Sequence, residues 1–157
     1  MKVIHYTIIS TLFFFLTINY SFSQDSLSFI KKRIREIQEL SLKINMLEGS
    51  IGDGNGFEMV FCYTNQELHI YEYYDNQDNL LFETIIFDKG LPIYYEWIRT
   101  KDYYNRTKKA LSFYKCYLKN GEIIKSVSKG KLPTKITAAS IFKSASKAIE
   151  TYKIICH

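Results

Sequence analysis

The sequence predicts an α+β domain: an N-terminal helix, a six-stranded antiparallel meander, and a C-terminal helix packed on one face of the sheet. Two segments with helical periodicity lie at either end of the chain, and most of the aromatic residues fall between them, within residues 57–128. That middle region is divided by short Asn, Asp and Gly turns and contains no helical segment. Strands that follow one another through short turns pair antiparallel, which makes the sheet a meander.

The first 23 residues have the pattern of a cleaved signal peptide. Lys2 gives a positive start, residues 8–18 are mostly apolar, and Ser21 and Ser23 place small residues before Gln24. The apolar run is shorter than the roughly 20 residues that span a membrane. We therefore expect residues 1–23 to be removed, no stable membrane span after cleavage, and a single α+β domain over residues 24–157 that is periplasmic or secreted.

Composition fits one globular domain of mild positive charge. The 157-residue chain has a net charge of +5, and the only basic residue of the predicted signal is Lys2. This charge is small for a nucleic-acid-binding protein, so nucleic acid is not an expected partner. In an oxidising compartment, Cys62, Cys116 and Cys156 predict one disulfide and one free thiol. All three pairings stay open, as does a chain with three buried thiols.

Both terminal helices follow from apolar stripes of helical spacing. Residues 25–47 form the first, with Asp25 or Ser26 as its cap and the basic run of residues 31–35 on its solvent face. Residues 137–155 form the second, capped by Thr134 or Thr137. The stripes are Ile30, Ile34, Ile37, Leu40, Ile44 and Leu47 in the first helix, and Ile141, Ala145, Ala148, Tyr152 and Ile155 in the second.

A glycine-rich segment over residues 48–56 separates the first helix from the strands and is expected to be a flexible loop. It lacks the ligand pattern of a calcium loop, and it precedes a strand rather than a helix, which excludes a dinucleotide-binding turn. The turns between the expected strands lie at residues 65–66, 75–79, 88–90 and 119–121, and a longer basic segment spans residues 100–109. The expected strands are Glu58–Thr64, Leu68–Tyr74, Leu80–Phe87, Leu91–Arg99, Ala110–Leu118 and Glu122–Ser128.

Large side chains occupy both faces of the expected strands. If both helices cover one face, the other presents an open aromatic surface, and tyrosine supplies contact area and a polar group at such surfaces. The residues of this candidate surface are His69, Tyr71, Tyr73, Tyr95 and Trp97.

The segment over residues 101–109 is a second candidate binding site. It interleaves Tyr103 and Tyr104 with Lys101 and Arg106, a pattern that can hold phosphates, acidic glycans or an acidic protein.

No motif in the sequence predicts a metal site or a cofactor. His69 is the only histidine within the strands, and a hydrolase built on it would need Glu83 or Tyr95 as a cross-strand partner. Enzymatic activity is therefore not the favoured interpretation, and we expect neither metal nor cofactor.

Two segments resemble strand-turn-strand units of small uncharacterised exported Bacteroidetes proteins. They are residues 70–80, Ile-Tyr-Glu-Tyr-Tyr-Asp-Asn-Gln-Asp-Asn-Leu, and residues 117–124, Tyr-Leu-Lys-Asn-Gly-Glu-Ile-Ile. The Phe-rich signal that ends in Ser-Gln is similar to theirs, and the resemblance implies a periplasmic or surface location.

The leading hypothesis is an exported, non-enzymatic module that binds a protein or glycan through the aromatic face or the basic loop. The alternatives are a carrier that holds a small apolar ligand between sheet and helices, and a hydrolase that uses His69.

Overall fold

A computed structural model describes residues 26–40, 47–52, 56–62, 67–75, 80–102, 105–132 and 135–156. Side chains are described in the same ranges except for residues 47–52, 56–62, 155 and 156. The predicted signal peptide lies outside the described residues, as do Tyr103 and Tyr104.

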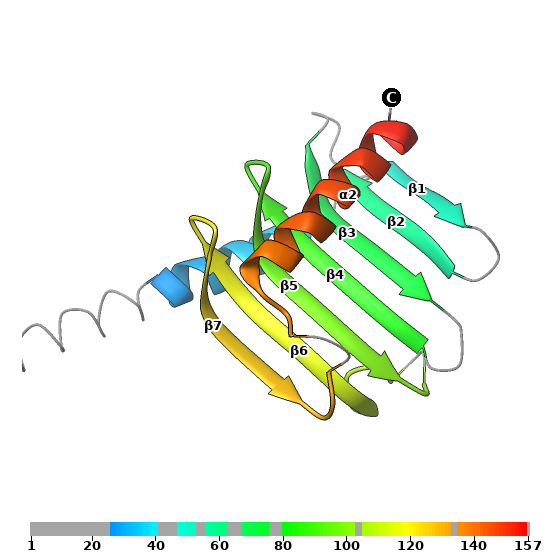
Figure 1. The fold of residues 1–157 in the computed structure, drawn as a ribbon. Coiled ribbons are helices and arrows are strands. Elements are labelled where there is room, and N and C mark those ends of the chain that lie inside the picture. The colour runs from blue at the N-terminus through cyan, green and yellow to red at the C-terminus, as the bar shows by residue number, and fades with distance from the viewer. Residues whose placement is uncertain are drawn as a thin grey trace, which may run out of the picture.

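The chain forms an α+β fold whose antiparallel sheet has seven strands in the order of the sequence (Figure 1). A helix over residues 26–40 precedes the sheet, and α2 (Ala138–Cys156) follows it. The strands are β1 (Leu47–Gly52), β2 (Gly56–Cys62), β3 (Leu68–Asp75), β4 (Leu80–Asp88), β5 (Leu91–Thr100), β6 (Ala110–Lys119) and β7 (Glu122–Lys129).

The prediction of six strands was wrong by one strand, β1. Its residues were expected to extend the first helix and then form a loop, because Gly49 and Gly52 weaken any regular pattern. In the structure β1 pairs with β2 along its whole length, from Leu47 opposite Cys62 to Gly52 opposite Phe57. A ladder uses backbone N–H and C=O groups, which glycine also supplies, so the pairing partner stabilises a strand that its own side chains do not predict.

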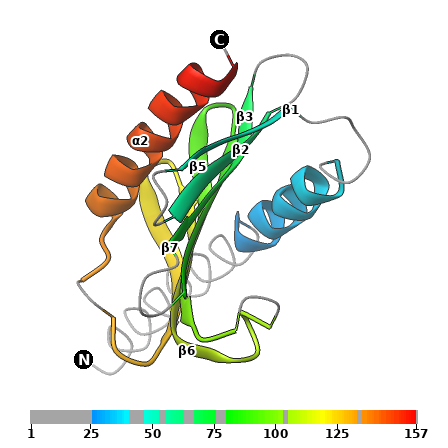
Figure 2. The ribbon, with the colours of Figure 1, turned by 90° about the vertical axis from the view of Figure 1, so that its right-hand side faces the viewer.

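The two helices lie on opposite faces of the sheet (Figure 2). The prediction that they share one face was wrong, and the reason is the large apolar side chains on both faces of the strands. Each face needs its own cover when both are apolar. We call the two sides the α2 face and the N-helix face.

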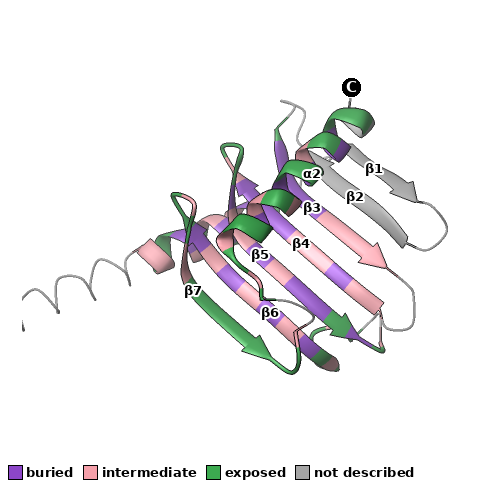
Figure 3. Ribbon diagram, viewed as in Figure 1, coloured by how far each residue is buried: buried purple, intermediate pink, exposed green. Residues whose placement is uncertain are grey.

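The α2 face holds the larger core. Tyr71, Ile85 and Trp97 from three neighbouring strands pack together there, and Ala145 and Ala148 let α2 approach closely. Figure 3 shows buried residues spread across the strands beneath this helix. The buried members are Leu68, Tyr71, Ile85, Phe87, Tyr95, Trp97, Tyr114, Cys116, Leu118, Ile141, Ala145, Ala148 and Tyr152.

The smaller core lies on the N-helix face, where Ile30, Ile34 and Ile37 pack on the sheet as their spacing predicted. The sheet contributes Ile70 and Ile86, with Ile93, Tyr94, Tyr117 and Ile124 beside them.

Two polar contacts also join the N-terminal helix to the sheet, each beside a hairpin turn. Arg33 Nη2 donates to Asp88 Oδ1 at 2.9 Å, and Lys119 Nζ donates to Ser26 Oγ at 2.7 Å.

Register shifts in three hairpins decide which residues reach the N-helix face. In β4–β5, Phe87 pairs with Pro92 and Ile86 with Tyr94, so Ile93 is an extra residue. A β-bulge of this kind interrupts the alternation of side chains. Ile93 therefore packs with Tyr94 in the N-helix core. Strict alternation along β5 would place Ile93 on the same face as Tyr95 and Trp97, and the bulge moves it to the opposite face.

The other two hairpins repeat this arrangement. In β6–β7, Leu118 pairs with Ile123 and Tyr117 with Lys125, which leaves Ile124 as the extra residue. In β2–β3 the shift lies between Cys62 and Phe61, opposite Leu68 and Ile70, which leaves His69 as the extra residue.

Two of these hairpins use two-residue turns with positive φ. Lys89 and Gly90 have φ of 52° and 75°, and Asn120 and Gly121 have φ of 51° and 85°. Two consecutive positive φ values are characteristic of the type I′ turn, whose twist matches that of the strands. The hairpin predicted from Asn120-Gly121 is thereby confirmed.

Candidate functional site

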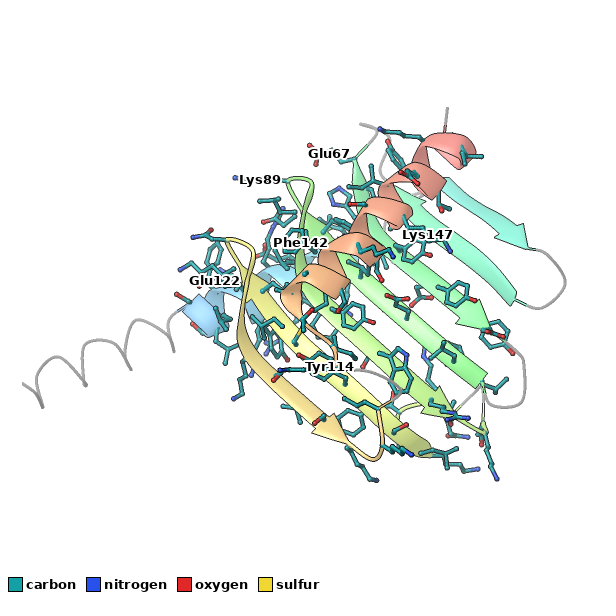
Figure 4. The ribbon with its side chains drawn as sticks, in the orientation of Figure 1. Glu67, Lys89, Tyr114, Glu122, Phe142 and Lys147 are labelled. Carbon is teal, nitrogen blue, oxygen red and sulfur yellow. The ribbon has the colours of Figure 1, made fainter. Side chains whose placement is uncertain are left out.

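The predicted aromatic face is mostly core. Tyr71, Tyr95 and Trp97 are only 2%, 6% and 8% exposed because α2 covers them. Tyr73 is half-buried, and Lys147 of α2 holds its ammonium 5.3 Å from the ring centroid (Figure 4). These residues stabilise the packing of α2 and do not form the open surface that the sequence predicted.

His69 lies apart from that cluster because of the β2–β3 register shift. Its side chain is buried, its Nε2 is 3.8 Å from Glu67 Oε2, and it hydrogen bonds to the backbone of Phe87. Burial lowers the pKa of His69, and the nearby Glu67 only partly offsets this effect. At 6% exposure the imidazole offers little surface to a substrate.

The two partners proposed for His69 interact with each other instead. The Tyr95 hydroxyl hydrogen bonds to Glu83, which lies diagonally across on β4, two residues from Ile85, the residue that pairs with Tyr95. Burial, and then the charge of Glu83, raise the pKa of Tyr95. This arrangement therefore does not support a hydrolase that uses His69.

The basic loop neutralises much of its own charge. Lys109 Nζ lies 2.6 Å from Asp102 Oδ2, and the backbone N–H of Asn105 donates to Asp102 Oδ1 at 3.0 Å. Together these contacts lower the pKa of Asp102 to about 2, with Lys109 the largest cause. The hydroxyl of the buried Thr100 donates to the Lys109 carbonyl at 3.2 Å and closes the loop at its base.

Arg106 joins this loop to the N-helix face of the sheet through two contacts. Its Nη2 is 3.4 Å from Glu72 Oε1, and its guanidinium lies 4.8 Å from the ring centroid of Phe82. Lys101 and Lys108 remain exposed. Of the four predicted loop residues, Lys101 is therefore free to contact a partner, whereas Arg106 is engaged within the chain and the two tyrosines lie outside the described residues.

The structure places a groove between the N-terminal helix and strands β5 and β6. It has a volume of about 350 Å3 and is open to solvent. The helix contributes Lys31, Ile34, Arg35 and Gln38, and the sheet contributes Tyr94 and Tyr117.

The groove is lined by both aromatic and cationic groups, which lie close to one another. The Tyr94 and Tyr117 ring centroids are 5.5 Å apart, and the Lys31 ammonium lies 5.6 Å from the centroid of Tyr117. Burial, followed by the charge of Glu96, raises the pKa of Tyr94, so its hydroxyl stays protonated. That hydroxyl hydrogen bonds to Glu96, which also forms an ion pair with Lys115.

The groove therefore has an excess of positive charge. Lys31 and Arg35 both line it, and within the described part of the chain Arg35 forms no ion pair. No carboxylate is among the described residues that line the groove, and Glu96, which accepts from Tyr94, already has Lys115 as a partner. Such a site can hold an anionic group, with charge-assisted hydrogen bonds from above and aromatic rings below.

Sequence reasoning missed this groove for two reasons. It assigned the basic run of residues 31–35 to a solvated helix face, although Lys31 and Arg35 are one helical turn apart beside the apolar stripe. It also could not place Tyr94 next to Tyr117, because that neighbourhood depends on the β5–β6 register.

The described ranges contain no cluster of three or more metal-ligating side chains. No helix within these ranges is both long and apolar enough to cross a membrane. No protein-family model, no curated protein and no solved structure matches this chain.

Proposed function

We propose that the protein is an exported, non-catalytic binding module that holds an anionic group of a protein or glycan in the groove beneath its N-terminal helix. The observation that carries the proposal is the pairing of Lys31 and Arg35 with Tyr94 and Tyr117 around an open groove of about 350 Å3. An anion there would lie within reach of the Lys31 ammonium and the Arg35 guanidinium, both of which give charge-assisted hydrogen bonds.

The proposed binding site is therefore the groove and not the aromatic face. The exposed part of the basic loop would lie beside the bound partner. The groove does not suit the alternative of an apolar-ligand carrier, because Lys31, Arg35 and Gln38 line it and it is open.

Binding to defined probes tests the groove. Protein purified after expression of the full chain is titrated calorimetrically with oligogalacturonate, with an oligoglutamate peptide, and with a neutral galactan as control. We expect one of the anionic probes to bind and the neutral one not to bind. Arg35→Gln should weaken binding about tenfold, the value of one charge-assisted contact.

Lys32→Gln is the matched control, because Lys32 is exposed on the same helix and does not line the groove. Equal loss of affinity in Arg35→Gln and Lys32→Gln would show a general charge effect and contradict the proposal.

Export is tested separately. Sequencing the N-terminus of the protein from the periplasm or medium should find Gln24 as the first residue, and an intact Met1 on cytoplasmic protein would refute export.

A further inference from the structure

Strand β7 is an exposed edge of the sheet. It pairs with β6 on one side, and no other strand of the described chain pairs with it. Residues 125–129 are all exposed, and the second half of β7 is coloured as exposed in Figure 3. An edge strand turns a row of N–H and C=O groups toward solvent, where an extended segment of another chain can pair with them.

The side chains of β7 alternate between charge and an apolar group on the N-helix face. The register places Lys125 beside Tyr117, Val127 beside Lys115 and Lys129 beside Phe113. Within the described residues neither Lys125 nor Lys129 has a carboxylate partner, and the nearby Glu96 forms its ion pair with Lys115. Val127, between the two lysines, is 49% exposed.

We infer that β7 accepts an extended acidic peptide as an eighth strand. Two acidic side chains of that peptide would lie opposite Lys125 and Lys129, and an apolar side chain between them would lie opposite Val127. Directly opposite residues in adjacent strands are in contact, so opposite charges attract across the new ladder. The peptide would thus have the sequence pattern acidic-x-apolar-x-acidic, where x is any residue. The inference stands on the edge strand and not on the groove, so either can fail alone.

The same lysines disfavour a second copy of this chain as the occupant when the two strands pair about Val127 or in parallel register. Two β7 strands paired antiparallel about Val127 would place Lys125 opposite Lys129 of the other copy. Parallel pairing in register would place each lysine opposite its own equivalent. Like charges directly opposite one another are unfavourable, and lysine on an edge is a common device against self-pairing. Complementary charge therefore points to an acidic partner.

A labelled, capped peptide Thr-Glu-Thr-Val-Thr-Glu-Thr tests the inference by fluorescence anisotropy. We expect it to bind at least about tenfold more tightly than the same peptide with lysine in place of glutamate. The variant Lys125→Glu/Lys129→Glu should reverse this preference and select the lysine peptide. The control variant Lys135→Glu/Lys143→Glu changes the net charge equally at exposed positions off β7 and should keep the original preference.

Backbone methylation of the peptide separates strand pairing from simple attraction of charge. In a strand, only every second N–H faces β7, so two peptides N-methylated on alternate residues should differ at least about tenfold in affinity. Equal binding of the two methylated peptides, whether tight or weak, would overturn the inference. Loss of preference in the Lys135→Glu/Lys143→Glu control would do the same. Arg35→Gln, which alters the groove, should leave peptide binding unchanged.

Discussion

At the scale of single residues, Gly130 leaves the least room for an added Cβ among the glycines whose surroundings the structure describes. It has a φ of +74°, and a Cβ added there would lie 2.5 Å from the Leu111 carbonyl oxygen and 2.8 Å from Ser112 Cβ. The atoms that it would meet include backbone, which cannot swing aside as a side-chain end can. Glycine at this position lets the chain leave β7 closely against β6.

We expect Gly130→Ala to lower the free energy of unfolding by more than about 2 kcal/mol, because positive φ costs about 1–2 kcal/mol and the clash adds to it. Gly90→Ala is the control, since Gly90 has a φ of +75° with nothing within 4 Å of an added Cβ. It should cost only the backbone term of about 1–2 kcal/mol. Urea denaturation measures both, and equal losses would contradict the close approach.

Asp102 is a second residue whose surroundings set a measurable property. Lys109 is the main cause of its low pKa of about 2, and the Asn105 N–H contributes to it. We expect Lys109→Met to raise the pKa of Asp102 toward, but not fully to, its ordinary value of 3.8, because the Asn105 contact remains. NMR titration of the Asp102 carboxyl measures the change.

The sign of the linked stability follows from the direction of the shift. The folded-state pKa of Asp102 is depressed, so its contribution to stability is present above the unfolded-state value and disappears as pH falls toward 2. Lys109→Met should reduce this acid dependence. An unchanged pKa of Asp102 in the variant would show that Lys109 does not form the ion pair with Asp102 in solution.

At the scale of elements, the N-terminal helix depends on a narrow apolar contact. Ile30, Ile34 and Ile37 are its buried side chains, and Ile37 is fully buried. The floor beneath them includes Ile93 and Ile124, the extra residues of two bulged hairpins. The two bulges therefore shape the surface on which this helix lies.

Ile37→Ala should destabilise the protein by about 2–4 kcal/mol, the range for truncating a buried isoleucine. Leu40→Ala on the same helix should cost less than about 1 kcal/mol, because Leu40 is 38% exposed. Hydrogen exchange should show faster exchange first in residues 26–40 of Ile37→Ala, before β5 and β6 lose protection. Comparable destabilisation by the two variants would show that the helix does not dock through Ile37.

The elements also show how far sequence reasoning reaches. Strands β3 to β7 were predicted within one residue at each end, because turn residues and alternating side chains mark them clearly. Helix α2 was predicted equally well, and Thr137 proved to be its cap, with the Ser140 N–H donating to Thr137 Oγ1 at 3.2 Å. The extra residues His69, Ile93 and Ile124 could not be predicted, since a bulge is set by pairing between strands and not by either strand alone.

The candidate site was the less predictable part for the same reason. The sequence identified Lys31 and Arg35 as a basic helix face, yet the groove exists only where that face meets Tyr94 and Tyr117. The location of Tyr71, Tyr95 and Trp97 depended on which face α2 covers, which the alternation of side chains cannot decide.

At the scale of the whole molecule, Cys116 on β6 belongs to the core between the sheet and α2. Its side chain is fully buried and its thiol is free. Burial raises the pKa of Cys116 to about 11, so the thiol is protonated and inert near neutral pH. A reagent can reach it only when the sheet and α2 separate.

Cys116 should therefore label only through global unfolding. We expect the logarithm of its labelling rate with a disulfide reagent, followed at this residue by peptide mass spectrometry, to fall linearly as the free energy of unfolding measured in urea rises. Ile37→Ala, which acts on the other face, should speed labelling only as far as it lowers global stability. Rapid labelling in native conditions would show that α2 opens independently of the sheet.

Strand order has a consequence for synthesis. Each strand pairs with the one made just before it, so hairpins can form as the chain leaves the ribosome, and local pairing of this kind favours fast folding. Helix α2 is made last, yet it lies against β1, β2, β3 and β5. A nascent chain that has emerged as far as Lys129 thus has all seven strands but a bare apolar face. Until α2 emerges, the described chain has no other helix to cover this face of the growing sheet.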